Sequence, residues 1–261
     1  MNPYVMKALL ATLGTWLVTA LGAALTFLFP GVKPKGMNAM LGFSAGVMVA
    51  ASFWSLLQPA VERAEGLARQ PAWLVATAGF LAGALFLCLS DLSLERIYIR
   101  RAGKNHGLRR AALLMLSITL HNIPEGLAVG VAFGALQSSQ NPQKDLLGAV
   151  AVAVGIGLQN FPEGAAVALP LRREGVSPRR SFFWGQASAM VEPVAGVAGA
   201  LLVGRMERLL PWALAFAAGA MILVAARELI PESQADRNSY GATAGVTLGF
   251  AAMTALDVML G

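Results

Sequence analysis

Long apolar runs recur along the chain and are separated by short polar or charged loops. A helix needs about 20 largely apolar residues to cross the hydrocarbon core of a bilayer. The pattern therefore predicts an all-α membrane protein with eight transmembrane helices, forming one transmembrane domain over residues 1–261. The predicted spans are about 8–29, 37–58, 72–90, 111–136, 146–170, 182–203, 211–230 and 240–260.

The first apolar run could also be interpreted as a signal peptide. Its apolar part is longer than the usual 7–15 residues of such a peptide, and Lys7 is its one preceding basic residue. These features favour a transmembrane span that remains in the mature protein over a signal peptide that is removed.

The distribution of lysine and arginine predicts how the spans are oriented. With eight spans, both termini and every second loop lie on the same side of the membrane. That side carries six of the 20 Lys and Arg residues, and the other side carries the remaining fourteen. Because short cytoplasmic loops are enriched in Lys and Arg, we expect both termini to be extracytoplasmic. The expected location is the plasma membrane, which in a bacterium is the inner membrane.

Composition agrees with this interpretation and excludes several classes of site. The chain is 56% hydrophobic and 13% charged, with a mean hydropathy of +0.62, whereas a soluble domain is about 25% charged. The net charge of +6 is explained by the basic loops, so we expect the lipid bilayer as a partner and no nucleic acid. The single cysteine, Cys88, excludes a disulfide within the chain, and two histidines exclude a three-histidine site.

Two copies of one polar motif interrupt the fourth and fifth apolar runs. The copies are 38 residues apart and read His121-Asn122-Ile123-Pro124-Glu125-Gly126 and Gln159-Asn160-Phe161-Pro162-Glu163-Gly164. Residues four apart share a helix face, so each copy places a carboxylate beside an imidazole or an amide. Each proline also disables a helical hydrogen bond, which frees the carbonyl four residues earlier.

A third acidic residue, Glu192, precedes Pro193 within the sixth run. At about 1.5 Å per helical residue, His121 and Glu192 lie roughly 15 Å, and Gln159 roughly 20 Å, from the ends of their spans. These depths are near the middle of a hydrocarbon core about 30 Å thick. An ionised side chain there costs about 3 kcal/mol, and a divalent cation is a simple source of compensating charge.

Other interpretations of these residues remain open at this point. A single Pro-Glu pair could be a kink beside a protonated acid, since burial disfavours the charged form of a carboxyl. A metal site of this kind could also activate water in an intramembrane metal-dependent hydrolase, although no HExxH motif is present. A purely structural scaffold is a third alternative. The doubled motif together with Glu192 favours a cation site.

The ligand types narrow the identity of the cation. One imidazole, carboxylates and amide oxygens suit zinc, iron(II), manganese or cadmium, and the site offers no thiolate for copper(I). Because no GxxxxGK[ST] loop occurs, ATP is not expected to drive transport within this chain. We expect no resident cofactor, and zinc as the transported ion.

The two motifs and Glu192 resemble the ZIP family of divalent-metal transporters, most closely its bacterial GufA-like branch, over essentially the whole chain. The resemblance implies a non-enzymatic transporter that moves metal into the cytoplasm by an elevator-like shift of one helix bundle past another. It also implies a 3+2+3 inverted-repeat architecture, in which spans 1–3 mirror spans 6–8 around spans 4 and 5. A homodimer is expected by the same analogy.

The resemblance further implies a binuclear site on spans four, five and six. One metal would be held by His121, Glu125, Gln159 and Glu163. The second would be held by Asn122, Asn160 and Glu192, with Glu125 and Glu163 bridging. Asn160 departs from relatives with Asp at this position, which removes one anionic ligand of the second metal. Asp91 and Glu228 lie at the cytoplasmic ends of their spans, where they either line the exit or are ordinary interface charges.

Glycines recur at four-residue spacing in several spans, for example Gly126, Gly130 and Gly134. Small residues at this spacing let membrane helices approach one another closely. The pattern predicts tight helix pairs, either within one chain or between chains.

Overall fold

The fold was analysed in a computed structural model that describes residues 2–29, 34–66, 70–101, 106–205, 207–235 and 240–260. Every regular element in these ranges is helical. In chain order they are α1 (Pro3–Ala23), α2 (Leu25–Leu28), α3 (Pro34–Ala51), η1 (Ser52–Leu57), α4 (Gln58–Gly66), α5 (Ala72–Arg101), α6 (His106–Gly134), η2 (Ala135–Ser138), α7 (Pro142–Arg173), α8 (Pro178–Ala187), α9 (Val191–Arg205), η3 (Glu207–Leu209), α10 (Leu210–Val224), η4 (Ala225–Leu229), α11 (Ile230–Ser233) and α12 (Tyr240–Leu260).

Seven helical stretches in the described part of the chain are long and apolar enough to cross a membrane. They are Pro3–Leu28, Lys35–Gly66, Ala72–Ser93, Pro142–Arg172, Pro178–Val203, Leu210–Ser233 and Tyr240–Leu260. The prediction of an all-helical, multi-pass membrane protein is therefore confirmed. The predicted span that is not among the seven is the fourth, 111–136. It corresponds to α6, a helix of 29 residues, so the count of eight stays a prediction.

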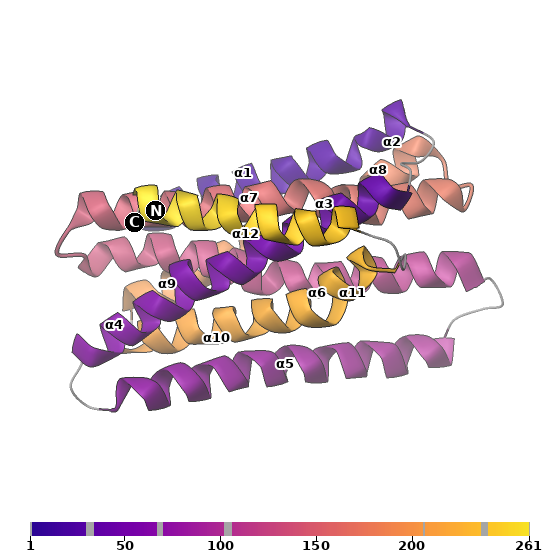
Figure 1. Cartoon of the computed structure of the whole chain (residues 1–261). Coiled ribbons are helices and arrows are strands. Elements are labelled where there is room, and N and C mark those ends of the chain that lie inside the picture. The colour runs from indigo at the N-terminus through magenta and orange to yellow at the C-terminus, as the bar shows by residue number, and fades with distance from the viewer. Residues whose placement is uncertain are drawn as a thin grey trace.

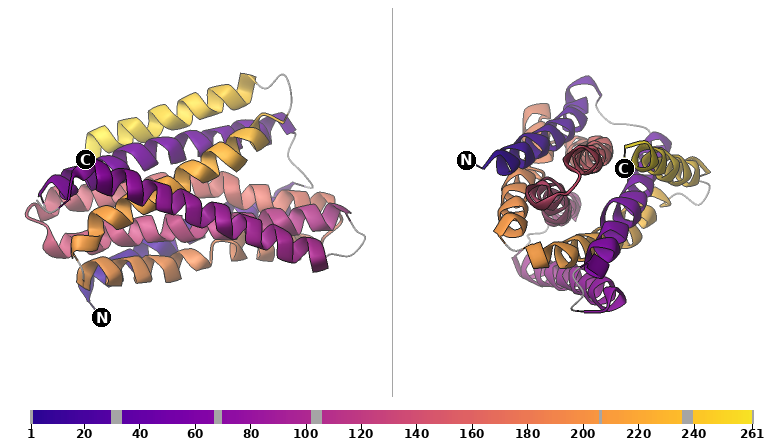
Figure 2. Two further views of the ribbon diagram at one scale, coloured as in Figure 1. Left: turned by 90° about the horizontal axis from the view of Figure 1, so that it is seen from below. Right: turned by 90° about the vertical axis from the view of Figure 1, so that its left-hand side faces the viewer.

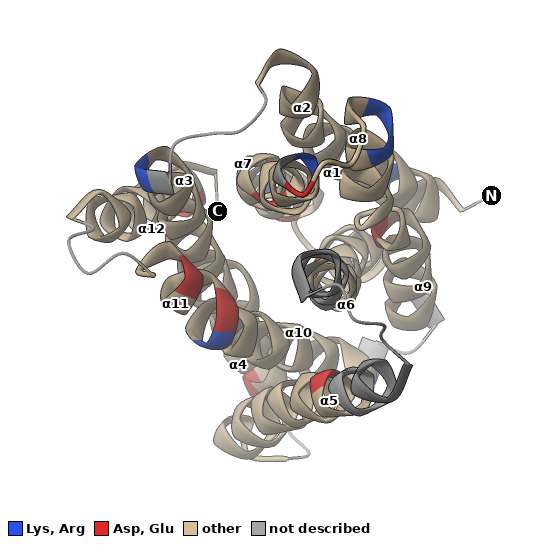
Figure 3. Ribbon diagram, turned by 90° about the vertical axis from the view of Figure 1, so that its right-hand side faces the viewer, with Lys and Arg blue, Asp and Glu red and all other residues tan. Residues whose placement is uncertain are grey.

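The two motif-bearing helices, α6 and α7, lie at the centre of the bundle, and the other long helices surround them (Figures 2 and 3). The peripheral helices expose their apolar side chains. Only 17% of the apolar window of α12 and 28% of that of α5 is buried, against 61% of the Lys35–Gly66 stretch. Both ends of the chain lie at the same end of the bundle (Figure 1).

One set of helices, which we call the first bundle, consists of α1, α6, α7, α8 and α9. Its helices touch backbone to backbone at glycines. A β-carbon at Gly130 of α6 would overlap the backbone oxygen of Gly196 in α9, and one at Gly164 of α7 would overlap that of Thr19 in α1. Gly196 also faces the side chain of Thr12 in α1. The first bundle is therefore packed too closely for its helices to slide individually.

A second set, which we call the second bundle, consists of α3, α4, α5, α10 and α12 with η1, η4 and α11. It contains two helix pairs of the same kind. A β-carbon at Gly46 of α3 would overlap the backbone oxygen of Val246 in α12, and one at Gly219 of α10 would overlap that of Phe80 in α5. The predicted glycine-mediated packing is thus confirmed, and these contacts lie within one chain.

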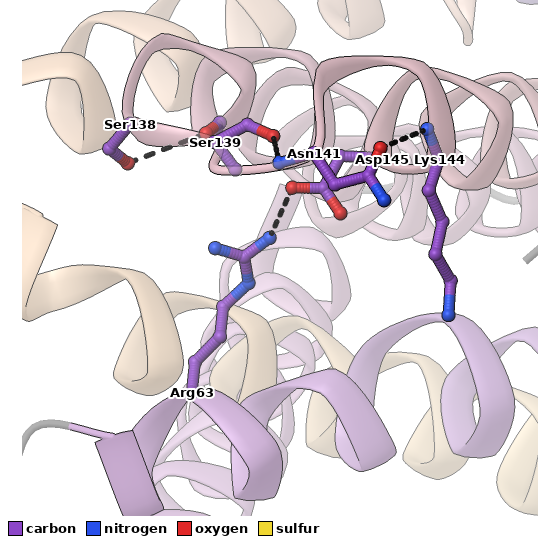
Figure 4. Close-up of polar contacts among 7 residues, drawn as sticks. Arg63, Ser138, Ser139, Asn141, Lys144 and Asp145 are labelled. Carbon is purple, nitrogen blue, oxygen red and sulfur yellow. Dashed lines mark hydrogen bonds and ion pairs between the residues drawn. The ribbon is translucent and has the colours of Figure 1, made fainter.

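The boundary between the two bundles is built differently. Here α7 faces α3 and α12, and α6 faces α10 and α5. A β-carbon at Gly155 of α7 would meet the flexible side chain of Met253 in α12 rather than its backbone. At one end of the bundle, Arg63 of α4 reaches across to Asp145 of α7, with Nη2 3.3 Å from Oδ2 (Figure 4). The bundles therefore meet through side chains, which can exchange partners.

We expect Gly22→Ala in α1 to destabilise the protein, because the added carbon would overlap the backbone oxygen of Phe161. Overpacking of this kind costs about 1–3 kcal/mol. Gly14 of the same helix has no atom within 4 Å of a built β-carbon, so Gly14→Ala is the matched control and should be within about 0.5 kcal/mol of wild type. The measurement is the thermal unfolding midpoint in detergent. Equal midpoints for the two variants would contradict this account of helix packing.

Candidate functional site

All seven residues predicted from the sequence as metal ligands have buried side chains on α6, α7 and α9. None is more than 3% exposed, and Glu125, Gln159, Asn160 and Glu192 are completely buried. Both α6 and α7 continue as helices through Pro124 and Pro162. The motif residues therefore point into the protein interior at mid-helix, where lipid and bulk water are absent.

The first link between the motifs joins α6 to α7. The side-chain amide of Gln159 donates a hydrogen bond to Oε1 of Glu125, with an Nε2–Oε1 distance of 2.6 Å. This bond orients the amide so that its oxygen, Oε1 of Gln159, has no hydrogen-bond partner among the described residues. The second oxygen of the Glu125 carboxylate, Oε2, also has no hydrogen-bond partner among the described residues.

Glu192 is held by two donors from other helices. Asn160 of α7 donates from Nδ2 to Oε1 of Glu192 at 2.9 Å, and the hydroxyl of Thr15 in α1 donates to Oε2. Asn160 also donates to the backbone oxygen of Thr15 at 3.2 Å. Both carboxylate oxygens of Glu192 therefore accept a hydrogen bond without any cation.

Glu163 accepts its hydrogen bond from across the bundle boundary. The hydroxyl of Ser44 in α3 lies 2.9 Å from Oε1 of Glu163 and 3.1 Å from the backbone oxygen of Gln159. Ser44 is completely buried. A residue of the second bundle thus contacts a predicted ligand of the first.

The sixth predicted span is broken next to the site. A turn at Ser188–Met190 separates α8 from α9, and Glu192 lies in the first turn of α9. Pro193 cannot donate to Ala189, and the backbone oxygen of Ala189 instead accepts from the N–H of Glu192 at 3.0 Å. Asn122 binds this turn, since its Nδ2 donates to the backbone oxygen of Ser188 at 2.8 Å. The break therefore gives Asn122 a main-chain partner.

His121 faces the second bundle. Its Nε2 lies 3.1 Å from Oε1 of Glu228 in η4, which is within ion-pair distance. One ligand atom each from Asp91, His121 and Glu228 lies within 4.8 Å of the others, a spacing that could hold a metal ion. The two acidic residues noted at the span ends, Asp91 and Glu228, thus lie beside a predicted ligand.

The predicted carboxylates lie close enough together to interact electrostatically. Glu125 interacts with both Glu163 and Glu192, and Glu163 interacts with His121. Four ligand-type atoms in this region, Glu125 Oε2, Gln159 Oε1, Asn160 Oδ1 and His121 Nε2, have no hydrogen-bond partner among the described residues. Leaving a buried polar atom unpaired costs about 1–3 kcal/mol. A divalent cation would satisfy such atoms and offset the mutual repulsion of the carboxylates.

Two polar residues of the site, Thr15 and Ser44, were not identified from the sequence. Thr15 belongs to a stripe of threonines, with Thr12 and Thr19, on the buried face of α1. Ser44 lies between Gly42 and Gly46 on the closely packed face of α3. The available signals were the threonine stripe of α1 and the serine between two glycines in α3, but neither indicates which carboxylate is contacted.

A cavity of about 340 Å³ opens between the bundles at the end that holds both chain termini. Its lining includes Glu62, Arg63, Asp145 and Asp257, and the hydroxyl of Ser55 donates to Oδ1 of Asp257 at 2.6 Å. The cavity also reaches Val152 of α7. Gln159 follows Val152 by seven positions, which is about 10 Å along the helix.

Comparison with known proteins identifies the family. The family model described as ZIP Zinc transporter matches residues 101–257. The chain belongs to the ZIP family. It is 40% identical to zinc transporter ZIP11 of Xenopus tropicalis, covering 98% of both chains, and 39% identical to zinc transporter GufA of Myxococcus xanthus, covering 97% of this chain and 98% of GufA. Zinc transporter ZIPB of Bordetella bronchiseptica is 33% identical, covering 99% of this chain and 82% of ZIPB. The resemblance to the ZIP family and to its GufA-like branch is confirmed.

We expect Thr15→Val to destabilise this ZIP-family chain by about 1–3 kcal/mol, the cost of leaving a buried partner unsatisfied, because Glu192 loses a donor from α1. Thr19→Val is the matched control, since the hydrogen bond of the Thr19 hydroxyl among the described residues goes to the carbonyl of Thr15 within its own helix, at 3.4 Å. Thermal unfolding of the metal-free protein measures the difference. Equal midpoints for the two variants would show that the Thr15–Glu192 bond contributes nothing.

Proposed function

We propose that this chain transports divalent metal ions, zinc foremost, across the membrane and into the cytoplasm. The observation that carries the proposal is a pair of buried oxygens, Oε2 of Glu125 and Oε1 of Gln159, that have no hydrogen-bond partner among the described residues and lie at the centre of the bundle with the buried imidazole of His121. Together with Glu163 these residues form the transport site. The similarity to proteins named as zinc transporters supports the same substrate, and it lends no support to a hydrolase.

The site binds one metal ion tightly. Both carboxylate oxygens of Glu192 already accept hydrogen bonds, one of them from Asn160. Asn122 donates to the backbone of Ser188. A second ion at Asn122, Asn160 and Glu192 would have to displace these bonds with fewer anionic ligands than the first. Cadmium, iron(II) and manganese have the same ligand preferences as zinc at a mixed nitrogen and oxygen site and compete for it.

Eight spans, with α6 as the eighth, best account for the connectivity. An even number of crossings agrees with the common position of both termini (Figure 1). The close helix pairs support an inverted repeat, because α1 packs on α7 as α9 packs on α6, and α3 packs on α12 as α10 packs on α5. Lys and Arg are found on α3, α7 and α8 at the end opposite the termini (Figure 3). That end is cytoplasmic by the positive-inside rule.

The metal ion passes between the two bundles. The cavity at the extracytoplasmic end is lined by acidic and basic residues, among them Glu62, Asp257, Arg63 and Lys144. It provides an entrance for the ion about two helical turns from Gln159. On the opposite side, His121 meets Asp91 and Glu228, and the side chain of Glu228 is 22% exposed. His121 therefore transfers the ion from the transport site towards the cytoplasm.

Movement of the first bundle past the second provides alternating access. Within each bundle the glycine contacts resist sliding, whereas the boundary is made of side-chain contacts such as Arg63–Asp145. The membrane potential drives the ion inward, since two charges crossing 100 mV gain about 4.6 kcal/mol. The protein functions in the plasma membrane, and we expect a homodimer by analogy with the family.

We expect purified protein in liposomes to show saturable zinc and cadmium influx, and Glu163→Gln to abolish it. The substitution keeps the size of the side chain and removes the charge that binds the ion. Metal-sensitive dye trapped in the liposomes measures the flux.

Glu174→Gln is the control for this experiment, because Glu174 is an exposed carboxylate at the end of the same helix. It should leave the flux unchanged. Flux that persists in Glu163→Gln at the wild-type rate would refute the assigned site, and a wild-type protein without flux would refute transport.

The number of bound ions provides a separate test. We expect one tightly bound zinc or cadmium ion per wild-type chain and two in Asn160→Asp, because the substitution supplies a second carboxylate beside Glu192. Equilibrium dialysis followed by elemental analysis measures the ratio of metal to protein. Two tightly bound ions in the wild type would contradict the single-ion site.

A further inference from the structure

Ser44 is the point where the second bundle contacts a carboxylate of the transport site. It is completely buried in α3, and both acceptors within reach of its hydroxyl belong to α7. The distances are 2.9 Å to Oε1 of Glu163 and 3.1 Å to the backbone oxygen of Gln159. These residues are 119 and 115 positions away in sequence, so only the docking of the two bundles brings them together.

The chemistry of the hydroxyl indicates which of the two acceptors is its main partner. A serine hydroxyl carries one proton and can donate one hydrogen bond at a time. A charged carboxylate oxygen is a stronger acceptor than a neutral carbonyl, so Glu163 is the main partner. The bond occupies one lone pair of Oε1 and leaves Oε2 for a cation. It orients the carboxylate without blocking it.

We propose that Ser44 is a positioning residue for Glu163, and that it makes the metal affinity of the site depend on the arrangement of the bundles. The proposal rests on the transport function proposed above. In the arrangement of this structure Ser44 holds the carboxylate for the cation. When the first bundle slides past the second, the hydrogen bond between Ser44 and Glu163 breaks, and the site releases its ion more readily.

Hydrogen-bond partners of metal ligands typically change metal affinity by 10–100-fold when they are removed. We expect Ser44→Ala to weaken zinc and cadmium binding to the purified protein by about 10–100-fold, measured by competition with a chelating dye. Ser52→Ala is the matched control. Ser52 is also buried on the same continuous span, and its hydroxyl donates within its own helix, to the carbonyl of Met48 at 2.7 Å. It should bind like wild type.

A volume-matched pair separates the hydroxyl from the packing. Ser44→Thr keeps the donor and Ser44→Val replaces it with a methyl group at nearly the same size. The threonine variant should retain several-fold tighter binding than the valine variant. Equal affinities in this pair, or wild-type affinity in Ser44→Ala, would overturn the positioning role.

A cross-link distinguishes positioning from a change in the bundle equilibrium. A β-carbon at Gly155 would lie 3.9 Å from Cγ of Met253, about where a cysteine sulfur would sit at that position. A disulfide between G155C and M253C, in a C88S background, should hold the present arrangement. Ser44→Ala should weaken binding to the same extent in the cross-linked protein. Recovery of the affinity on cross-linking would overturn the proposal, because Ser44 would then act through the equilibrium alone.

The same measurements separate this proposal from the transport function. A wild-type protein that binds neither zinc nor cadmium would refute the transport site, and the role of Ser44 with it. A wild-type protein that binds metal and loses it in Glu163→Gln, but not in Ser44→Ala, would refute only the role of Ser44.

Discussion

Burial of several carboxylates at the centre of a membrane bundle is the constraint around which this protein is arranged. Water cannot solvate these groups, and each ionised side chain at that depth costs about 3 kcal/mol. The described structure provides each of them with a donor from a different helix. Gln159 donates to Glu125, Ser44 to Glu163, and Thr15 with Asn160 to Glu192. The positions of α1, α3 and α7 relative to one another follow from these bonds as much as from apolar packing.

Glycine contacts make such short bonds possible. Thr and Ser have short side chains, so they reach another helix only where the backbones are nearly in contact. The last residue of each motif supplies this contact. Gly126 packs against the backbone of Glu192, and Gly164 packs against the backbone of Thr19. Each motif thus contains both predicted ligands and the glycine that brings the next helix within reach of them.

Backbone contacts at glycines within the bundles and side-chain contacts between them suit the movement that we propose. Two backbones in contact at a glycine have only one favourable register, because sliding brings side chains into the contact. Side-chain contacts such as Arg63–Asp145 can be broken and replaced with little strain. The boundary between the bundles is therefore the plane along which the proposed movement would occur. The predicted ligands His121 and Glu163 both have partners across it.

The sequence by itself determined that the chain is a multi-pass helical membrane protein, that its glycines pack helices together, and that the seven polar residues of the motifs and span six are buried. These properties depend on the periodicity and length of local segments. It also led to the ZIP family through those motifs. It did not determine that Thr15 and Ser44 serve Glu192 and Glu163, since partners 177 and 119 positions apart leave no local pattern. Only the tertiary structure brought Asp91 and Glu228 to His121 and divided the helices into two bundles, because these arrangements depend on which helices meet and at what height.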